Sequence, residues 1–159
     1  MNDNLGLPRA RIFELIAQAR PATVDGLAKK LGDAVAVEVI KPPEAVVVMS
    51  RVRETVDNAV FNLGEVLVTE AEVVISGVKG YMMVMGLDKA KALNGAVLDA
   101  VTASGHPLTG EIIAGLLADE GVRRNHHHRL WAAVKRTQVD FIGGQVEEFK
   151  PSDRSKDNR

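Results

Sequence analysis

Apolar residues recur at helical spacing at both ends of the chain and at strand-like spacing in between. From Arg9 to Ala19 they fall three and four positions apart, which predicts a first helix. Pro21 ends this run, because a proline disfavours helical geometry in the residue before it. A second helix follows, with Thr23 suited to cap its amino end and Gly32 suited to stop it. The pattern therefore begins with a small helical hairpin.

Valine and isoleucine dominate the next part of the chain, from about Val35, as is typical of half-buried strands. Pro42 and Pro43 interrupt the first runs, because proline cannot donate a hydrogen bond to a central ladder. The alternation slips near Thr69, which predicts a bulge or bend there. The Ser-Gly pair at 76–77 predicts a hairpin turn. We expect about four to five strands, paired antiparallel because their connections are short.

Helical spacing returns after the strands. Asp88 is suited to cap a helix that ends at Gly105 and Pro107, and we expect this helix to lie on the sheet. Two more helical segments are predicted, from Thr109 to about Asp119 and from Val122 to about Arg136. The order predicts the α+β class, an antiparallel sheet flanked by amino-terminal and carboxy-terminal helices.

The length of 159 residues fits one domain, which we expect over residues 1–149, followed by a disordered polar tail at 150–159. A hydrophobic fraction of 46% with 26% charged residues excludes a wholly disordered chain. The formal net charge of -1 provides no general attraction to phosphate backbones, so no nucleic-acid partner is expected.

The chain contains no cysteine, which excludes thiolate nucleophiles and cysteine-ligated clusters, and we expect no cofactor in this chain. The amino-terminal stretch lacks the continuous apolar region of a secretory signal, and no run of about 18 apolar residues follows. These features predict a cytoplasmic protein without a membrane partner.

Three groups of residues have chemistry suited to a site. Histidines 126–128 are consecutive, and consecutive helical residues point in different directions, which favours solvated side chains over a shared metal. Glu65, Glu70 and Glu72 suit acid/base chemistry, although acids on a solvated strand face give the same pattern. At 85–91 a glycine precedes a helix start that contains lysine, which suits either an anion site or a simple cap.

Several sequence blocks occur together in a fixed order. A Pro-Pro-Glu element ends at Glu44 and leads a valine-rich strand with Arg51 and Arg53. The segment FNLGEVLVTE at 61–70 and a Gly-x-Asp-Lys helix start at 86–89 follow. This ordered set resembles the PhnG family of phosphonate metabolism, whose members belong to the carbon-phosphorus (C-P) lyase system.

Other blocks extend this resemblance to about residues 9–142. They are RIFELIAQA at 11–19, Leu-Asp-Ala at 98–100 and TQVDF at 137–141. The chain departs from the family at three places. Many members carry a threonine and glycine where this chain has Ala45 and Val46, and a glycine-rich turn where it has ETVD at 54–57. Many also carry an arginine where this chain has Leu87. These departures weigh against an anion-binding role for that turn or that arginine position.

The resemblance implies partnership with the PhnH, PhnI and PhnJ subunits in a two-fold symmetric core, together with an ABC-type subunit. In that system the complex displaces adenine from ATP with methylphosphonate and gives α-D-ribose 1-methylphosphonate 5-triphosphate. Nucleosidase-like chemistry is associated with PhnI, and radical cleavage of the C-P bond with the iron-sulfur protein PhnJ. The resemblance therefore implies a transferase activity of the complex, and we expect the isolated chain to be inactive.

No catalytic residue can be assigned from the sequence, but residues in the family-like blocks are candidates for contact with a partner or ligand. The candidates are Glu44, Arg51, Glu65, Thr69, Asp88, Lys89 and Asp140. The strand that contains Tyr81, Met82, Met83 and Met85 suits either an interface or burial on both faces. Two alternatives stay open: a stand-alone carboxylate-dependent enzyme acting on phosphonate or nucleotide, and a homo-oligomeric module that binds a small ligand.

Overall fold

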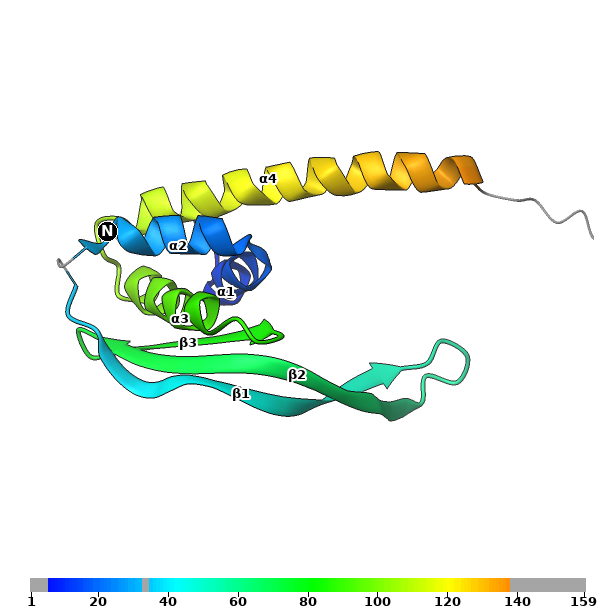
Figure 1. The fold of residues 1–159 in the computed structure, drawn as a ribbon, viewed down its shortest axis with the longest axis horizontal. Helices are drawn as coiled ribbons and strands as arrows, with labels where there is room; N and C mark the ends of the chain where they lie inside the picture. Colours follow the sequence, from blue (N-terminus) through cyan, green and yellow to red (C-terminus); the bar gives the residue numbers. More distant parts are fainter. Residues whose placement is uncertain (1–5, 33–34, 138–159) are drawn as a thin grey trace, which may run out of the picture.

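The fold places helices on one face of a small antiparallel sheet, which confirms the predicted α+β class (Figure 1). The computed structural model describes residues 6–32 and 35–137. The elements are α1 (Arg9–Gln18), α2 (Pro21–Lys29), β1 (Glu38–Arg53), β2 (Val60–Ile75), β3 (Val78–Met85), α3 (Lys89–Ala103), α4 (Thr109–Val134) and the 3-10 turn η2 (Lys135–Thr137). None of the helices in these ranges combines the length and apolar character needed to cross a membrane.

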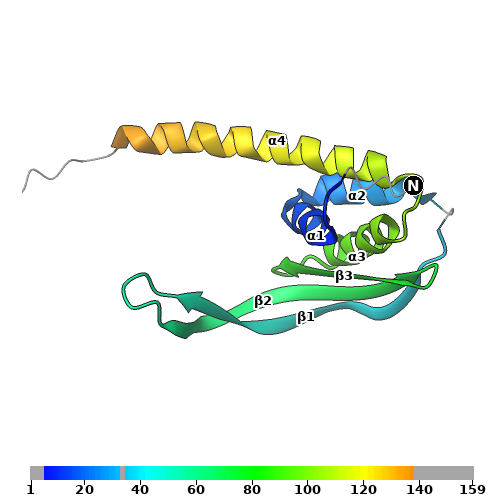
Figure 2. The ribbon, with the colours of Figure 1, turned by 180° about the vertical axis from the view of Figure 1, so that it is seen from behind.

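The elements form three layers. The sheet has the order β1-β2-β3, and α3 packs on its β2 and β3 strands. Helices α1, α2 and α3 lie between the sheet and α4, as both Figure 1 and the reverse view in Figure 2 show. Gly80 permits the close approach of α3, because a Cβ at this position would lie 2.1 Å from the carbonyl oxygen of Ala96.

The described residues form three strands instead of the expected four to five. The first runs are one continuous strand, β1, whose register with β2 shifts between Lys41 and Glu44. This bulge accommodates Pro42 and Pro43 in an edge strand, where only one side needs a ladder partner. The irregularity predicted near Thr69 does not lie in β2 itself, whose register with β3 is continuous, but in β1, where the shift falls opposite Glu70 to Glu72.

The predicted hairpin turn is confirmed. Ser76 and Gly77 have φ angles of 51° and 77°, and they join the paired residues Ile75 and Val78. Positive φ at both central positions gives the turn a twist that suits a two-residue hairpin.

The helices differ from the expectation at two places. The two segments predicted after Thr109 are one helix of 26 residues, because the helix continues through Gly121 despite the cost of about 1 kcal/mol for an internal glycine. The cap predicted at Thr23 is wrong, because α2 begins at Pro21 and the Thr23 hydroxyl donates to Asp119 instead. The cap at Asp88 is confirmed: its Oδ1 accepts from the backbone N–H of Lys91 at 2.9 Å.

Asp99 joins α3 to the sheet edge and to α1. Asp99 is 1% exposed, and its carboxylate accepts a hydrogen bond from the backbone N–H of Tyr81 at 3.0 Å. Arg9 donates to the same carboxylate through Nε at 3.1 Å and through Nη2 at 2.7 Å. The Arg9 Nη2 also donates to the Lys79 carbonyl at 2.6 Å. The side chains of Arg9 and Asp99 therefore form hydrogen bonds with backbone groups on the unpaired edge of β3.

Asp119 joins the start of α2 to the middle of α4. Its carboxylate accepts from Arg20 Nε at 2.6 Å, Thr23 Oγ1 at 2.6 Å and Arg123 Nε at 2.9 Å. Burial alone raises the pKa of Asp119, but the hydrogen bonds from Thr23, Arg20 and Arg123 outweigh it and lower the pKa to about 2. Asp119 is therefore a buried, ionised anchor for the amino-terminal hairpin.

Candidate interaction site on two arms

Three candidate residues lie where β3 passes into α3. Thr69 is fully buried, and its hydroxyl donates to the Gly86 carbonyl at 2.6 Å. Asp88 caps α3, and Lys89 is exposed as the first residue of that helix. The contacts of Thr69 and Asp88 hold the connection itself, whereas Lys89 presents its side chain to solvent.

The remaining candidates are spread along the sheet. Glu44 is exposed on β1 opposite Glu70, and Arg51 and Glu65 lie exposed much farther along the β1–β2 pair. The structure therefore does not bring the candidates together in one site. Asp140 lies outside the described residues, as does the tail predicted at 150–159.

Of the acidic residues predicted as an acid/base set, Glu70 and Glu72 share one face of β2 and Glu65 lies apart from them. Glu70 accepts from Lys41 Nζ and from Tyr81 Oη, the latter at 2.7 Å. The hydrogen bond from Lys41, followed by that from Tyr81, lowers the pKa of Glu70. Burial and the bond to Glu70 raise the pKa of Tyr81 to about 12. Glu65 lies opposite Met49, away from this group, so the described strands contain no paired-carboxylate geometry for it.

Histidines 126–128 are exposed on α4, as the consecutive spacing predicts. Within residues 6–32 and 35–137, no group of three or more His, Cys, Asp or Glu side chains is arranged to hold a metal ion. An apolar cavity of about 620 Å³ lies between α2, α3 and the approach to β1, and none of the candidate residues lines it.

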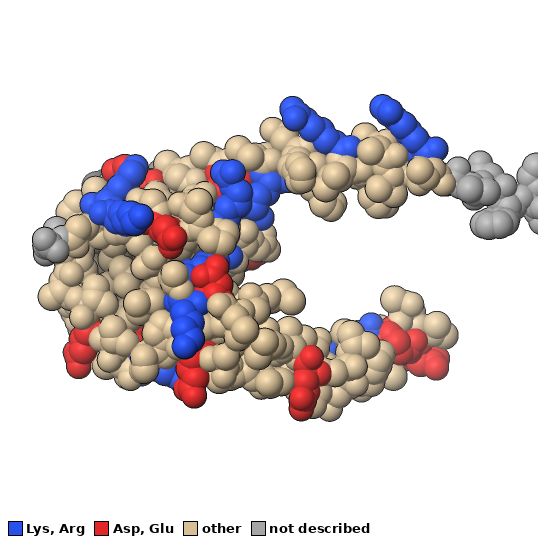
Figure 3. Space-filling model, in the orientation of Figure 1, with Lys and Arg blue, Asp and Glu red and all other residues tan. Residues whose placement is uncertain are grey.

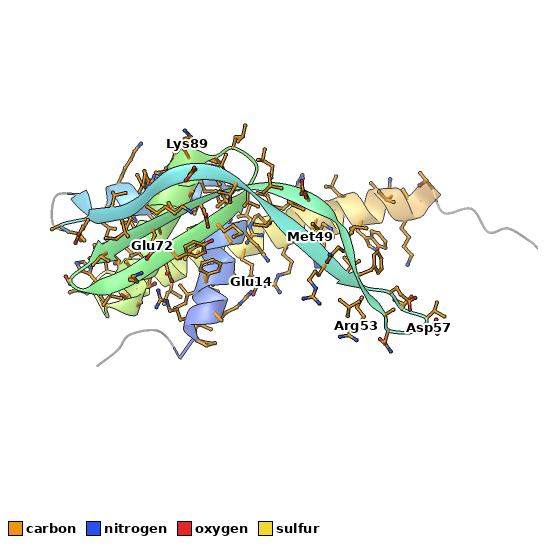
Figure 4. All side chains as sticks on the ribbon, turned by 90° about the horizontal axis from the view of Figure 1, so that it is seen from below. Glu14, Met49, Arg53, Asp57, Glu72 and Lys89 are labelled. Atoms are coloured by element: carbon orange, nitrogen blue, oxygen red, sulfur yellow. The ribbon has the colours of Figure 1, made fainter. Side chains whose placement is uncertain are left out.

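The β1–β2 pair continues well beyond the end of β3, and we call residues 47–67 the ribbon arm (Figure 1). Thr69 and Ala71 face α3, and in a strand every second residue shares a face. Leu67 and its cross-strand partner Val47 therefore continue the helix-facing side, followed by Met49. Met49 is 52% exposed, and Figure 4 shows it on the part of β1 that extends past β3.

Helix α4 extends beyond the other helices in the same direction, and we call residues 121–137 the helix arm (Figure 1). Its inner stripe begins with the buried residues Ile112 and Leu116. Helical periodicity places Leu130, Trp131 and Val134 on the same stripe, about four turns later. All three are exposed, Trp131 by 63%.

The two arms border an open gap (Figure 3). Figure 3 also shows that the basic side chains visible on the helix arm point away from this gap. Both inner faces therefore carry apolar residues in line with faces that form the core elsewhere, together with Glu65 on the ribbon arm and with Arg123 and His127 on the α4 stripe between Leu116 and Leu130. Exposed apolar residues gathered on facing surfaces are typical of an interaction site in a protein.

The methionine-rich strand resolves into several environments. Met82 is fully buried against α3, Met83 is half-buried on the opposite face, and Met85 is exposed at the strand end. Tyr81 stacks on Phe13 with ring centroids 6.3 Å apart. Burial therefore accounts for most of this strand and Met85 is exposed at its end, whereas an interface role for the strand stays a prediction.

Sequence comparison assigns the family. The family model for phosphonate metabolism protein PhnG matches residues 7–143. No curated protein matches the chain. An α+β chain with two uncovered apolar arms has the features of a subunit that binds other proteins. The chain belongs to the PhnG family, and its role is in phosphonate metabolism as part of the carbon-phosphorus lyase system.

Proposed function

We propose that this chain is an assembly subunit of the carbon-phosphorus lyase core complex, which binds PhnH, PhnI, PhnJ and the ABC-type subunit. The complex transfers ribose triphosphate from ATP to methylphosphonate and releases adenine. The observation that supports this proposal best is the pair of uncovered apolar inner faces on the ribbon arm and the helix arm. Apolar surface that is exposed in the isolated chain is stabilised when a partner covers it.

The chain contributes structure rather than reacting groups to the transfer. Glu65, the candidate base of a stand-alone enzyme, is exposed on the ribbon arm opposite Met49, away from Glu70 and Glu72. An exposed carboxylate without a second acid beside it lacks the geometry of an acid/base pair. We therefore propose that the complex is active and the isolated chain is inactive.

The exposed candidate residues also serve assembly with the partner subunits. Glu44, Arg51, Glu65 and Lys89 are exposed at strand or helix positions, where substitution leaves packing unchanged. We place these side chains at partner contacts, with Thr69 and Asp88 holding the β3–α3 connection between them.

The test is reconstitution with and without this chain. PhnH, PhnI, PhnJ and the ABC-type subunit are produced together, and adenine release is measured from ATP with methylphosphonate. We expect release only when this chain is included, and we expect a tag on this chain to recover the other core subunits. Full adenine release without this chain, or release by this chain alone, would overturn the proposal.

A further inference from the structure

We infer that the gap between the ribbon arm and the helix arm accepts one helix of a partner subunit, apolar on two sides and acidic along its edge. This inference rests on the proposed role in assembly and specifies what the arms bind. It concerns residues 47–67 and 121–137, which face each other across the gap in Figure 3.

The gap corresponds to the middle layer of the fold. We call the described residues outside the two arms the body: residues 6–32, 35–46 and 68–120. In the body, α1, α2 and α3 separate the sheet from α4 (Figure 1). The two outer layers continue beyond these helices with apolar residues on their inner faces, at Met49 and Leu67 on the ribbon and at Leu130 and Val134 on α4, and with Glu65 beside Met49. The part of the molecule formed by the two arms therefore lacks only the middle layer.

The missing element is a helix because both borders of the gap present side chains rather than backbone groups. A strand adds to a sheet through the hydrogen-bonding groups of an edge, which run in the plane of the sheet. The inner side of the ribbon arm is a sheet face, with the side chains of Val47, Met49 and Leu67 directed out of that plane. Side-chain faces of this kind pack against an amphipathic helix, as Ala71 and Val73 do against α3.

The charge of the helix arm identifies an acidic partner. Residues 121–137 contain no aspartate or glutamate, and their cations are Arg124, Arg129, Lys135 and Arg136 together with Arg123, which is paired with Asp119. Helical periodicity places Arg124 and Lys135 on one flank of the apolar stripe, beside the gap. Carboxylates along the edge of an inserted helix that faces the helix arm would lie next to these two cations. Glu65 on the opposite border disfavours acidic residues on the ribbon side, so the acidic edge is the one beside α4.

The same charge argues against a second copy of this chain as the occupant. The apolar faces of α1, α2 and α3 are already packed against other elements of the chain, so the apolar helical surface that a second copy has available is its own helix arm. Insertion would place two basic arms side by side, with like charges and no acidic residue on either. We therefore assign the gap to a different subunit.

Photo-crosslinking in the assembled complex tests this inference. A benzophenone amino acid replaces Met49 in one variant and Leu130 in another, and each complex is recovered through a tag on this chain before irradiation. We expect both positions to label the same partner subunit, within one predicted helical segment rich in Asp and Glu. Val122 and Val56 are matched controls, because both are exposed but lie off the inner faces, and we expect them to miss that segment.

The outcomes separate the two proposals. Failure of every variant and of the unsubstituted chain to recover other subunits would contradict the assembly role, and the inference with it. Recovery of the complex with labels on different subunits, on a second copy of this chain or on a strand would overturn the inference alone. Met49→Asp and Leu130→Asp provide a second measurement: we expect at least about a tenfold loss of complex, as for a buried interface contact, and none for Val122→Asp.

Discussion

The two ends of α4 have the same apolar stripe and opposite surroundings. Leu116 and Leu130 lie on that stripe, yet Leu116 is fully buried and Leu130 is 52% exposed. The sheet repeats the contrast, with Val73 buried under α3 and Leu67 uncovered on the same face of β2. An apolar pattern thus identifies the face that is covered, but it does not say whether the same chain supplies the cover.

The largest expected effect is in the body. Leu116→Ala should lower the free energy of unfolding by about 3 kcal/mol, because it removes buried methyl groups and leaves a cavity between α4 and the inner helices. Urea unfolding of the purified chain measures the loss. A change below about 1 kcal/mol would mean that the body is not packed around this side chain.

The second effect tests the ionised anchor of the body. Asp119→Asn should cost about 2 kcal/mol at pH 7, because it removes the carboxylate that binds Arg20, Thr23 and Arg123. The folded-state pKa of Asp119, about 2, lies below the unfolded value of about 3.9. This stabilisation is therefore present above about pH 4 and is lost as the pH falls toward 2.

Urea unfolding of the wild type and Asp119→Asn at several pH values checks the sign. The difference between the two proteins should shrink as the pH falls from about 4 to 2. Glu111→Gln is the matched control, because the Lys30–Glu111 pair has both side chains exposed and should contribute little. A difference that is independent of pH would show that the Asp119 carboxylate is not the source.

The third effect lies at the junction of body and sheet. Asp88→Ala should cost about 1 kcal/mol, because the first turn of α3 loses its cap on the Lys91 N–H. Asp88→Ser should restore most of this loss, and the neighbouring Lys89→Ala should have no effect on thermal melting. Equal melting temperatures for Asp88→Ala and Lys89→Ala would contradict the capping role.

The smallest effect on stability is expected in the arms. Leu130→Ala should change the free energy of unfolding by no more than about 0.5 kcal/mol, because the side chain is already exposed. The same variant should reduce recovery of the complex, so Leu116→Ala and Leu130→Ala form a matched pair on one helix. A loss of stability comparable to that of Leu116→Ala would show that the arm packs within its own chain.

The fold class could be predicted from local signals, because those signals were strong and short-ranged. The cap at Asp88 and the turn at Ser76 and Gly77 each depend on only a few neighbouring residues. The continuity of β1 through Pro42 and Pro43 could not be predicted, because it depends on the position of the strand at an edge. The continuity of α4 likewise depends on packing in the body, which offsets the local cost of Gly121.

The candidate site was less predictable, because motif blocks emphasise charged residues and the arms are mainly apolar. Leu130, Trp131 and Val134 continue the stripe of Leu116, and this alignment was the available signal. In sequence it is identical to the signal of a core helix. Asp119 was missed for a related reason, since its partners at Arg20 and Thr23 are remote along the chain.

The Asp119 anchor also sets an order of events during translation. Its bond to Arg20 joins residues separated by 99 positions, so the amino-terminal hairpin leaves the ribosome long before its anchor exists. At about 5 to 20 residues per second, the hairpin waits roughly 5 to 20 s for α4. During that interval α1, with its core residues Ile12, Leu15 and Ile16, lacks its contacts with α4. Nascent chains arrested before and well after Asp119 should therefore differ in protease resistance at α1, with resistance appearing only in the longer chain.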